Sequence, residues 1–270
     1  MKSICLACVI YTLKDKEPKD NLYFNIFYMW LTMLIKNGGL EKDDILHIHI
    51  DSRSLEYLEN THTICKLLLE KLQCEFIIHS FNPPENSLRG MMQKYECTEY
   101  TQDIYIYTDI DTYILKPIRT IFNKLNTDTY YFLKGVSLNH KFYSEGFPET
   151  FIPENVLSTL PGFNASLFII TSNKLRNTFF SRIHELCDYS SQNLCVEQPY
   201  FNRALYEIPR NEISVNTELL SNYAKFFGQH ISSTVIFLDF SGDTTNGLVH
   251  FTKMSGVMCL MLLDSLIISE

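Results

Sequence analysis

Two aspartates in the middle of the chain, Asp109 and Asp111, have the type and spacing of residues that bind a metal ion. They follow residues 103–107, an aromatic and aliphatic run that is typical of a buried strand. Residues two apart on an extended chain point to the same side, so both carboxylates face one way at the end of that strand. Hard cations such as Mg²⁺ and Mn²⁺ prefer such ligands, and two carboxylates this close need a cation or a proton. The pair therefore predicts a metal site, with a turn bearing two solvated carboxylates as the alternative.

The elements that must position this pair alternate between strands and helices in the first half of the chain. The expected strands are residues 3–12, 44–50, 75–79 and 103–107. The expected helices are residues 21–36, 55–72 and 88–97. Such alternation predicts an α/β fold with a mostly parallel sheet between two layers of helices. Ligands of these sheets lie beyond the carboxyl ends of the strands, which here directs attention to Thr12, Asp51 and the residues after Tyr107.

The second half of the chain is less regular. The expected strands are residues 130–134, 162–171, 235–238 and 248–251. The expected helices are residues 118–125, 174–189, 197–206 and 257–268. Residues 140–154, which are rich in aromatic residues, glycine and proline, predict a surface loop. Because no linker interrupts the pattern, we expect a single domain over residues 1–270, in which residues 1–112 form a nucleotide-binding half.

The composition is that of a folded globular protein, with 46% hydrophobic and 20% charged residues. Because 31 acidic residues outweigh 23 basic ones and give a net charge of −8, binding to nucleic acid or to anionic membranes is not expected. No apolar run reaches the roughly 20 residues that span a bilayer, and residues 4–11 indicate a strand rather than a signal peptide. Cys5 and Cys8 would point to opposite faces of that strand, so the pair is not expected to form a disulfide or to bind a metal. A reducing cytosol is therefore the default compartment.

A second group of metal-ligand types, His47, His49 and Asp51, alternates along the strand expected at residues 44–50 and just beyond it. Alternation places all three on one face of the strand. Both faces of a parallel strand are normally covered, so two buried or edge-facing histidines are favoured over a second metal site. Asp51, at the end of the strand, is a candidate for contact with a base or a ribose.

The segment around the acidic pair resembles the metal-binding motif of the family 8 retaining glycosyltransferases, the group that includes glycogenin and the bacterial galactosyltransferases. That motif reads approximately as an aromatic residue, a hydrophobic residue, Asp-x-Asp and Thr, and residues 107–112 here are YTDIDT. The resemblance implies a GT-A-type three-layer α/β fold with a mixed, mostly parallel sheet. It also implies that Asp109 and Asp111 bind Mn²⁺ or Mg²⁺ beside a nucleotide-sugar donor.

Four further blocks resemble the family in the same order along the chain. Lys94 stands where family members place a lysine that contacts the donor, and Asn164 belongs to a block, FNASLF, that lies near the donor sugar. Glu197 and Gln198 match the block beside the reacting carbon, where either side chain could stabilise positive charge on the anomeric carbon. His250 matches the histidine that supplies the third protein ligand of the metal.

Together these blocks imply a retaining transfer of a hexose from a nucleotide-diphosphate sugar, with UDP as the expected nucleotide, to a glycan or a glycosylated protein. The first half of the chain, with Thr12 after its first strand, would bind the nucleotide, and residues 113–270 would bind the donor sugar and the acceptor. The metal would neutralise the charge that develops on the diphosphate. Front-face attack and a covalent intermediate both stay open, as do self-glycosylation and assembly into a homodimer.

The chain departs from the family pattern after His250. The family has a glycine at the third position after the histidine and a lysine at the sixth, and these positions hold Lys253 and Gly256 here. Lys253 is therefore a candidate to replace the lysine that grips the diphosphate. Ser166 in place of a glycine and Glu197 in place of an aspartate also suggest a distant branch.

Two other functions are compatible with the sequence. A catalytically silent relative could bind a nucleotide-sugar or a glycan as a scaffold. A sugar-phosphate nucleotidyltransferase would share the layered fold, but residues 12–18 lack the glycine-rich phosphate loop that it normally has. The acceptor sequence for N-glycosylation at Asn164 would lie inside the donor site, which favours a cytoplasmic enzyme.

Overall fold

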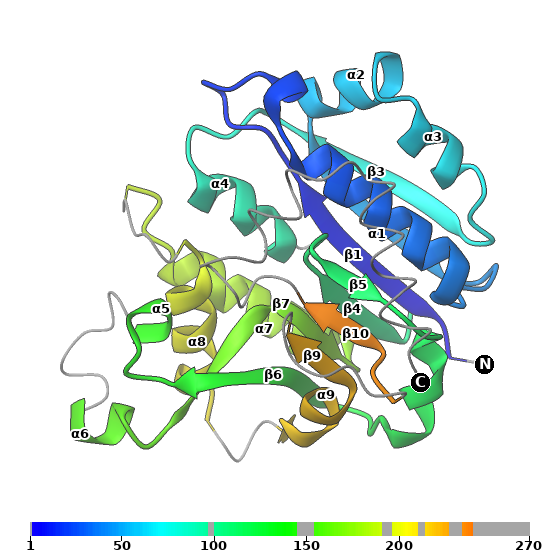
Figure 1. Ribbon diagram of the computed structural model, residues 1–270. Helices are drawn as coiled ribbons and strands as arrows, with labels where there is room; N and C mark the ends of the chain where they lie inside the picture. The colour runs from blue at the N-terminus through cyan, green and yellow to red at the C-terminus, as the bar shows by residue number, and fades with distance from the viewer. Residues whose placement is uncertain are drawn as a thin grey trace.

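The computed structural model describes residues 2–96, 100–144, 154–190, 196–209, 214–226 and 234–239. Its central feature is a seven-stranded sheet in the order β3-β2-β1-β4-β7-β6-β8 (Figure 1). These strands are β1 (Ile4–Ile10), β2 (Ile45–Asp51), β3 (Glu75–Phe81), β4 (Ile104–Thr108), β6 (Thr129–Ser137), β7 (Pro161–Ile170) and β8 (Ser214–Asn216). Neighbouring strands are parallel except where β7 pairs with β4 and β6. The predicted α/β fold around a mixed, mostly parallel sheet is confirmed.

The central strands are continuous apolar runs because helices cover both faces of the sheet. Every residue of β1 is buried. Its even-numbered residues, from Ile4 to Ile10, belong to one core cluster, whereas Cys5, Ala7 and Val9 belong to the other, as the two-residue period of a strand requires. The same period separates Cys5 from Cys8 on opposite faces, and both are free thiols.

Two layers of helices enclose the sheet, which gives three layers in all (Figure 1). The first core cluster lies under α1 (Tyr23–Asn37), α2 (Ser52–Asn60) and α3 (Ile64–Leu69). The second lies under α4 (Ser87–Met91), the 3-10 helix η2 (Met92–Tyr95), α7 (Asn173–Leu186) and α8 (Gln198–Glu207). In the described part of the chain, no helix has both the length and the apolar character needed to cross a bilayer.

The chain changes sides of the sheet between β1 and β4. β1, β2 and β3 follow one another toward one edge, and β4 then pairs with the other side of β1. The helices before β3 cover one face, and α4 and η2, which connect β3 to β4, cover the other. In open α/β sheets, such a switch point opens a crevice at the carboxyl ends of the strands, where ligands bind.

A smaller sheet continues from the end of β4. It contains β5 (Thr112–Ile114), β10 (Phe237–Asp239) and β9 (Ala224–Phe226), with β10 in the middle. β10 pairs antiparallel with β5 and parallel with β9 (Figure 1). Residues 109–111 therefore join the two sheets, and the acidic pair lies at the corner between them.

The helix expected at residues 55–72 is wrong, because the structure has two helices, α2 and α3, in its place. The backbone N–H groups of Thr61 and His62 both donate to the carbonyl of Tyr57, which ends α2 there. Threonine and asparagine are poor helix formers, and they cluster at this break. The apolar spacing simply continued across the break, so periodicity alone did not show it.

Several short elements differ from the predicted pattern. The helix expected at residues 118–125 is the 3-10 helix η3 (Ile118–Lys124). The expected loop at 140–154 contains the short helix α5 (Lys141–Ser144), and its last residue begins α6 (Glu154–Leu157). The 3-10 helix η1 (Pro18–Asp20), β5, β8, α9 (Glu218–Tyr223) and β9 were not expected, because runs of three to six residues show no clear period. The elements expected at 248–251 and 257–268 lie outside the described residues.

Candidate active site

A cleft of about 600 Å³ opens at the switch point, beyond the carboxyl ends of β1 and β4. It is lined by the end of β1, the loop between β1 and α1, part of α4 and the turn after β4. Asp109 and Asp111 come from the turn, Thr12 from the loop and Tyr23 from the start of α1. The residues around Thr12 and after β4 were expected to bind ligands because they follow strand ends, and they meet in one cleft.

The loop between β1 and α1 is held from the end of β2 by Asp51, which is fully buried. Oδ2 of Asp51 accepts a hydrogen bond from the N–H of Thr12 at 2.8 Å. Oδ1 accepts from the N–H groups of Arg53 and Ser54, both at 3.1 Å, and so caps α2. Both oxygens are thus engaged by backbone, which gives Asp51 a structural role instead of the contact with a base or a ribose considered from the sequence.

Arg53 and Asn21 hold the rest of this loop. The guanidinium of Arg53 donates to the carbonyl of Lys14 at 2.8 Å and also to the carbonyl of Lys16. Nδ2 of Asn21 donates to the hydroxyl of Thr12 at 2.8 Å. The hydroxyl and the N–H of Thr12 therefore help to build the wall of the cleft.

The two aspartates lie on a tight turn between the two sheets. The N–H of Thr112 donates to the carbonyl of Asp109 at 3.0 Å, and the N–H of Asp109 donates to the carbonyl of Ser166 at 2.7 Å. The hydroxyl of Tyr107 donates to Oδ1 of Asp109 at 2.5 Å. Burial, together with the charge of Asp109, raises the pKa of Tyr107 well above its ordinary value, so its hydroxyl stays protonated and keeps donating. Asp111 is buried, with 7% of its surface exposed, and it lines the same cleft.

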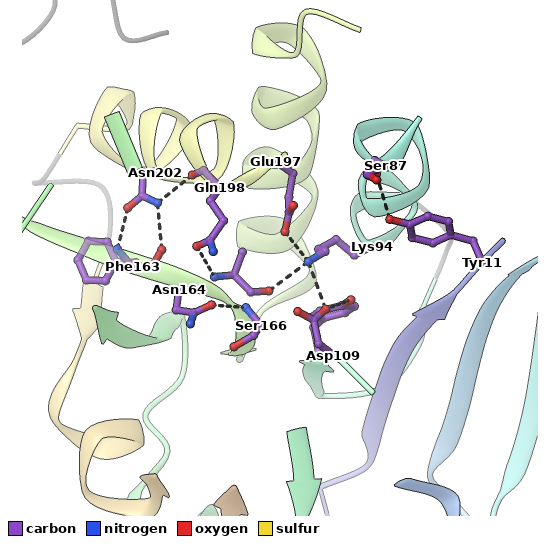
Figure 2. A network of polar contacts seen from close by, with 12 residues as sticks. Tyr11, Ser87, Lys94, Asp109, Phe163, Asn164, Ser166, Glu197, Gln198 and Asn202 are labelled. Carbon is purple, nitrogen blue, oxygen red and sulfur yellow. Dashed lines mark hydrogen bonds and ion pairs between the residues drawn. The ribbon is translucent and has the colours of Figure 1, made fainter. Parts of the chain in front are cut away.

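Behind Asp109 lies the ammonium of Lys94, which comes from η2 and has no exposed side-chain surface. Nζ of Lys94 donates to Glu197 at 2.6 Å, to Oδ1 of Asp109 at 3.3 Å and to the carbonyl of Ala165 at 3.4 Å (Figure 2). Burial alone would lower the pKa of Lys94, but the two carboxylates outweigh it and raise the pKa above its ordinary value. The ammonium therefore bridges two acidic residues that are far apart in the sequence.

The remaining predicted donor-site residues join the same network (Figure 2). Oε1 of Gln198 accepts from the N–H of Ala165 at 3.3 Å. Oδ1 of Asn164 accepts from the N–H of Ser166 at 2.9 Å. Because the carbonyl of Ser166 binds the backbone of Asp109, this polar network is continuous from α8, across β7, to the acidic turn.

The start of α8, where Glu197 lies, is fastened to β7 by hydrogen bonds and follows a residue with a strained backbone. Asn202 accepts from the N–H of Phe163 at 2.8 Å and donates to the carbonyl of Phe163 at 3.0 Å, which fastens α8 to β7 (Figure 2). Val196, directly before Glu197, has a φ of 53°, in the left-handed region that β-branched residues rarely adopt. Backbone strain of this kind is typical of functional sites, where the surrounding structure holds it in place.

The cleft is acidic. Its lining includes four carboxylates, those of Glu17, Asp20, Asp109 and Asp111. Lys16 is the basic residue in that lining. A nucleotide diphosphate would be repelled here without a cation, and the oxygen donors of the turn fit a divalent cation that prefers oxygen ligands.

Among the described residues, no three His, Cys, Asp or Glu side chains form a complete metal cluster. The predicted ligand His250 and the predicted donor contact Lys253 lie outside those residues.

His47 and His49 of β2 are buried on the same face of the sheet as Ala7 and Val9, and they stack with the partly exposed His79 of β3. Nδ1 of His47 lies 2.8 Å from Nε2 of His79, and the rings of His49 and His79 stack with centroids 4.7 Å apart. Nε2 of His49 lies 3.2 Å from the hydroxyl of Tyr100. Burial lowers the pKa of His47 and of His49 to about 3, with smaller effects of the neighbouring histidines and, for His47, of Arg176. The two buried histidines favoured from the sequence are confirmed.

Acid is expected to destabilise the protein through this stack. The pKa of each buried histidine is about 3 in the fold and about 6.5 in the unfolded chain, so the unfolded chain binds more protons between these values. Each histidine's contribution is fully present above pH 6.5 and is lost as the pH falls toward 3. Between pH 7 and pH 5 the loss of unfolding free energy is about 2 kcal/mol per histidine.

Urea unfolding at both pH values measures this loss. His49→Gln should reduce the loss, and His140→Gln, at an exposed position, should leave it unchanged. Equal losses in both variants and the wild type would contradict this account.

Neither a protein-family model nor a curated protein matches the sequence of this chain. The structure, in contrast, is similar to the crystal structure of mouse xyloside xylosyltransferase 1 in its apo form. The TM-score is 0.58, the sequence identity is 15%, and the match covers 90% of this chain and 99% of that chain. The chain has a GT-A-type glycosyltransferase fold. At this identity the likeness establishes the fold, and any activity must be argued from the site.

Within this GT-A-type fold, the predicted site residues fall into three groups. One polar network contains Lys94, Asp109, Asn164, Glu197 and Gln198. The cleft is lined by Thr12, Asp109 and Asp111. His250 and Lys253 lie outside the described residues, so their roles stay predictions.

Sequence reasoning missed three contributors to the site. Tyr107 belongs to the motif, but nothing in the sequence indicates its hydrogen bond to Asp109. Tyr23 lines the cleft at the start of α1, and Arg53 clamps the loop before it. An N-cap at Asp51 would place Arg53 in the first turn of the next helix, but its contact with the loop after β1 has no signal in the sequence.

Proposed function

We propose that the protein is a metal-dependent glycosyltransferase that moves a hexose from a nucleotide-diphosphate sugar to a glycan or a glycosylated protein, with retention. UDP is the proposed nucleotide. One observation carries the proposal. Asp109 and Asp111 line the switch-point cleft, and Asp109 also belongs to the polar network that contains Glu197 and Gln198. The GT-A-type fold and a structural neighbour that is a xylosyltransferase support glycosyl transfer as the reaction class.

The acidic turn is the proposed metal site. Asp109 and Asp111 would hold Mn²⁺ or Mg²⁺, with His250 as the third protein ligand. When bound, the ion neutralises negative charge on the diphosphate as it departs. Without it, the acidic lining of the cleft would oppose the binding of the donor.

The chain's own residues supply the other parts of the reaction. Tyr11 and Tyr23 line the cleft beside Thr12 and would bind the base and the ribose. Glu197 and Gln198, held by the buried network, would stabilise positive charge as it develops on the anomeric carbon. A carboxylate and an amide oxygen fixed by hydrogen bonds need little reorganisation during the reaction, which is what electrostatic stabilisation requires.

The proposal is tested by incubating the protein with a panel of UDP-hexoses, UDP-xylose, Mn²⁺ and glycan acceptors, and measuring the release of UDP. We expect metal-dependent release with at least one UDP-hexose, and a product whose anomeric configuration, measured by NMR, equals that of the donor. Release from UDP-xylose alone would contradict the hexose assignment. Binding of UDP without turnover of any donor would support the silent scaffold, and formation of pyrophosphate from a sugar phosphate and UTP would support a nucleotidyltransferase.

Arg53→Lys is expected to weaken the binding of UDP in the presence of Mn²⁺ about three- to tenfold. One lysine ammonium cannot hold two backbone carbonyls as the guanidinium fork does, and one lost hydrogen bond costs about 1 kcal/mol. Isothermal titration calorimetry measures the effect. The matched control is Arg89→Lys, which changes an exposed ion pair with Glu85 at 4.0 Å and should leave the affinity as it is. If both variants bind UDP equally well, the clamp does not shape the nucleotide site.

A further inference from the structure

The ammonium of Lys94 is the feature of this site whose position the proposed reaction does not explain. Its side chain is fully buried, and it lies between the side chains of Glu197, 4% exposed, and Asp109, 21% exposed. Asp109 is thus one of the four carboxylates that line the cleft, and it is also a partner of the positive charge of Lys94 (Figure 2). Any cation that binds Asp109 from the cleft must share that carboxylate with Lys94.

Elementary electrostatics gives the direction in which the charge of Lys94 changes the binding of ions in the cleft. A positive charge 3.3 Å from Oδ1 of Asp109 opposes a second cation at the same carboxylate and favours an anion in the cleft. The hydroxyl of Tyr107 donates to the same oxygen at 2.5 Å, so two donors already compete there with a metal ion. Glu197 offsets part of this charge, but it lies on the far side of the ammonium from Asp109, so the nearer positive charge dominates at the acidic pair (Figure 2).

We propose that Lys94 is a built-in counter-cation of the acidic pair, which lowers its affinity for a divalent cation and raises the affinity of the cleft for the anionic nucleotide. The inference rests on the proposed function, because it concerns the same metal and the same donor. The cation then binds weakly by itself and enters together with the nucleotide diphosphate. Lys94 acts through its charge on binding, and this role requires no contact with the reacting atoms.

A matched pair of variants isolates that charge. Glu197→Gln and the double variant Lys94→Met/Glu197→Gln carry the same residue at position 197 and differ only in the ammonium. The double variant avoids a buried carboxylate without a partner, and thermal unfolding checks that both variants are folded. The concentration of free Mn²⁺, measured by electron paramagnetic resonance, gives the metal affinity, and calorimetry with UDP in EDTA gives the metal-free nucleotide affinity.

The expected results have opposite signs. Relative to Glu197→Gln, the double variant should bind Mn²⁺ at least roughly tenfold more tightly and metal-free UDP several-fold more weakly. The single variant Glu197→Gln should bind Mn²⁺ more weakly than the wild type, because it removes the negative charge that offsets Lys94. A merely structural role for Lys94 would weaken both ligands together, and that result would overturn the inference, as would unchanged affinities. In either case the proposed function would stand, whereas a wild-type protein that binds no Mn²⁺ even with UDP would overturn the metal site and the inference together.

Discussion

Asp109→Asn and Asp111→Asn should each lower the rate of UDP release from a nucleotide-sugar by about 10²- to 10³-fold or more at ordinary Mn²⁺ concentrations. Each substitution keeps the shape of the side chain and removes the charge that would hold the cation against the diphosphate. The two side chains line the same cleft at the corner between the sheets, so both losses should be large. A coupled assay for UDP, run at saturating donor, measures the effect.

The control for this prediction is Asp43→Asn, which removes a charge from an exposed position before β2. It should release UDP at the wild-type rate. Circular dichroism spectra of all three variants should match that of the wild type, since each change is isosteric. Wild-type turnover in both Asp109→Asn and Asp111→Asn would show that the acidic turn is a solvated turn without a metal, which is the alternative that the sequence left open.

Lys94→Met should lower the free energy of unfolding by about 3 to 5 kcal/mol, because breaking a buried ion pair leaves one charge without compensation. The carboxylate of Glu197 would lose a partner at 2.6 Å while it remains buried. Urea unfolding monitored by circular dichroism measures the loss. Lys66→Met, at an exposed position of α3, should change stability by less than about 0.5 kcal/mol.

The double variant Lys94→Met/Glu197→Gln should recover most of this loss, since neither remaining side chain carries a charge. The comparison of the two variants therefore separates the cost of an uncompensated carboxylate from the cost of lost packing. A single variant as stable as the wild type would contradict the buried ion pair. A double variant no more stable than the single one would assign the loss to packing around Lys94.

The parts of the fold that the sequence predicted are those with strong local patterns. β1 and β4 are continuous apolar runs because both of their faces are buried, and the side chain of Ser172 caps α7, which begins at the next residue. In the three-stranded sheet only β10 overlaps an expected strand, the one at residues 235–238, and the pairing of the sheet could not be predicted. Its strands have three residues each, and β5 pairs with β10, which lies more than a hundred residues away, so pairing and not local pattern defines them.

The candidate site shows the same contrast between residues found by local pattern and contacts between distant residues. Asp109 and Asp111 could be singled out by local spacing after a strand, and the structure places both in the cleft. The ion pair of Lys94 with Glu197 joins residues 103 positions apart, and nothing in the residues around either one indicates the other. Asp51 shows the opposite difficulty, because an aspartate after a strand looks the same in the sequence whether it binds a ligand or caps the next helix.

The most direct test of the metal-dependent nucleotide site is a crystal structure with UDP and Mn²⁺, in which anomalous scattering locates the manganese. The account predicts one anomalous peak within about 2 to 2.5 Å of carboxylate oxygens of both Asp109 and Asp111. It also predicts the nucleotide base in the cleft beside Thr12 and Tyr23, His250 as a further ligand of the ion, and the ammonium of Lys253 within about 6 Å of a phosphate oxygen. Manganese bound away from the acidic turn, or UDP bound outside this cleft, would contradict the account.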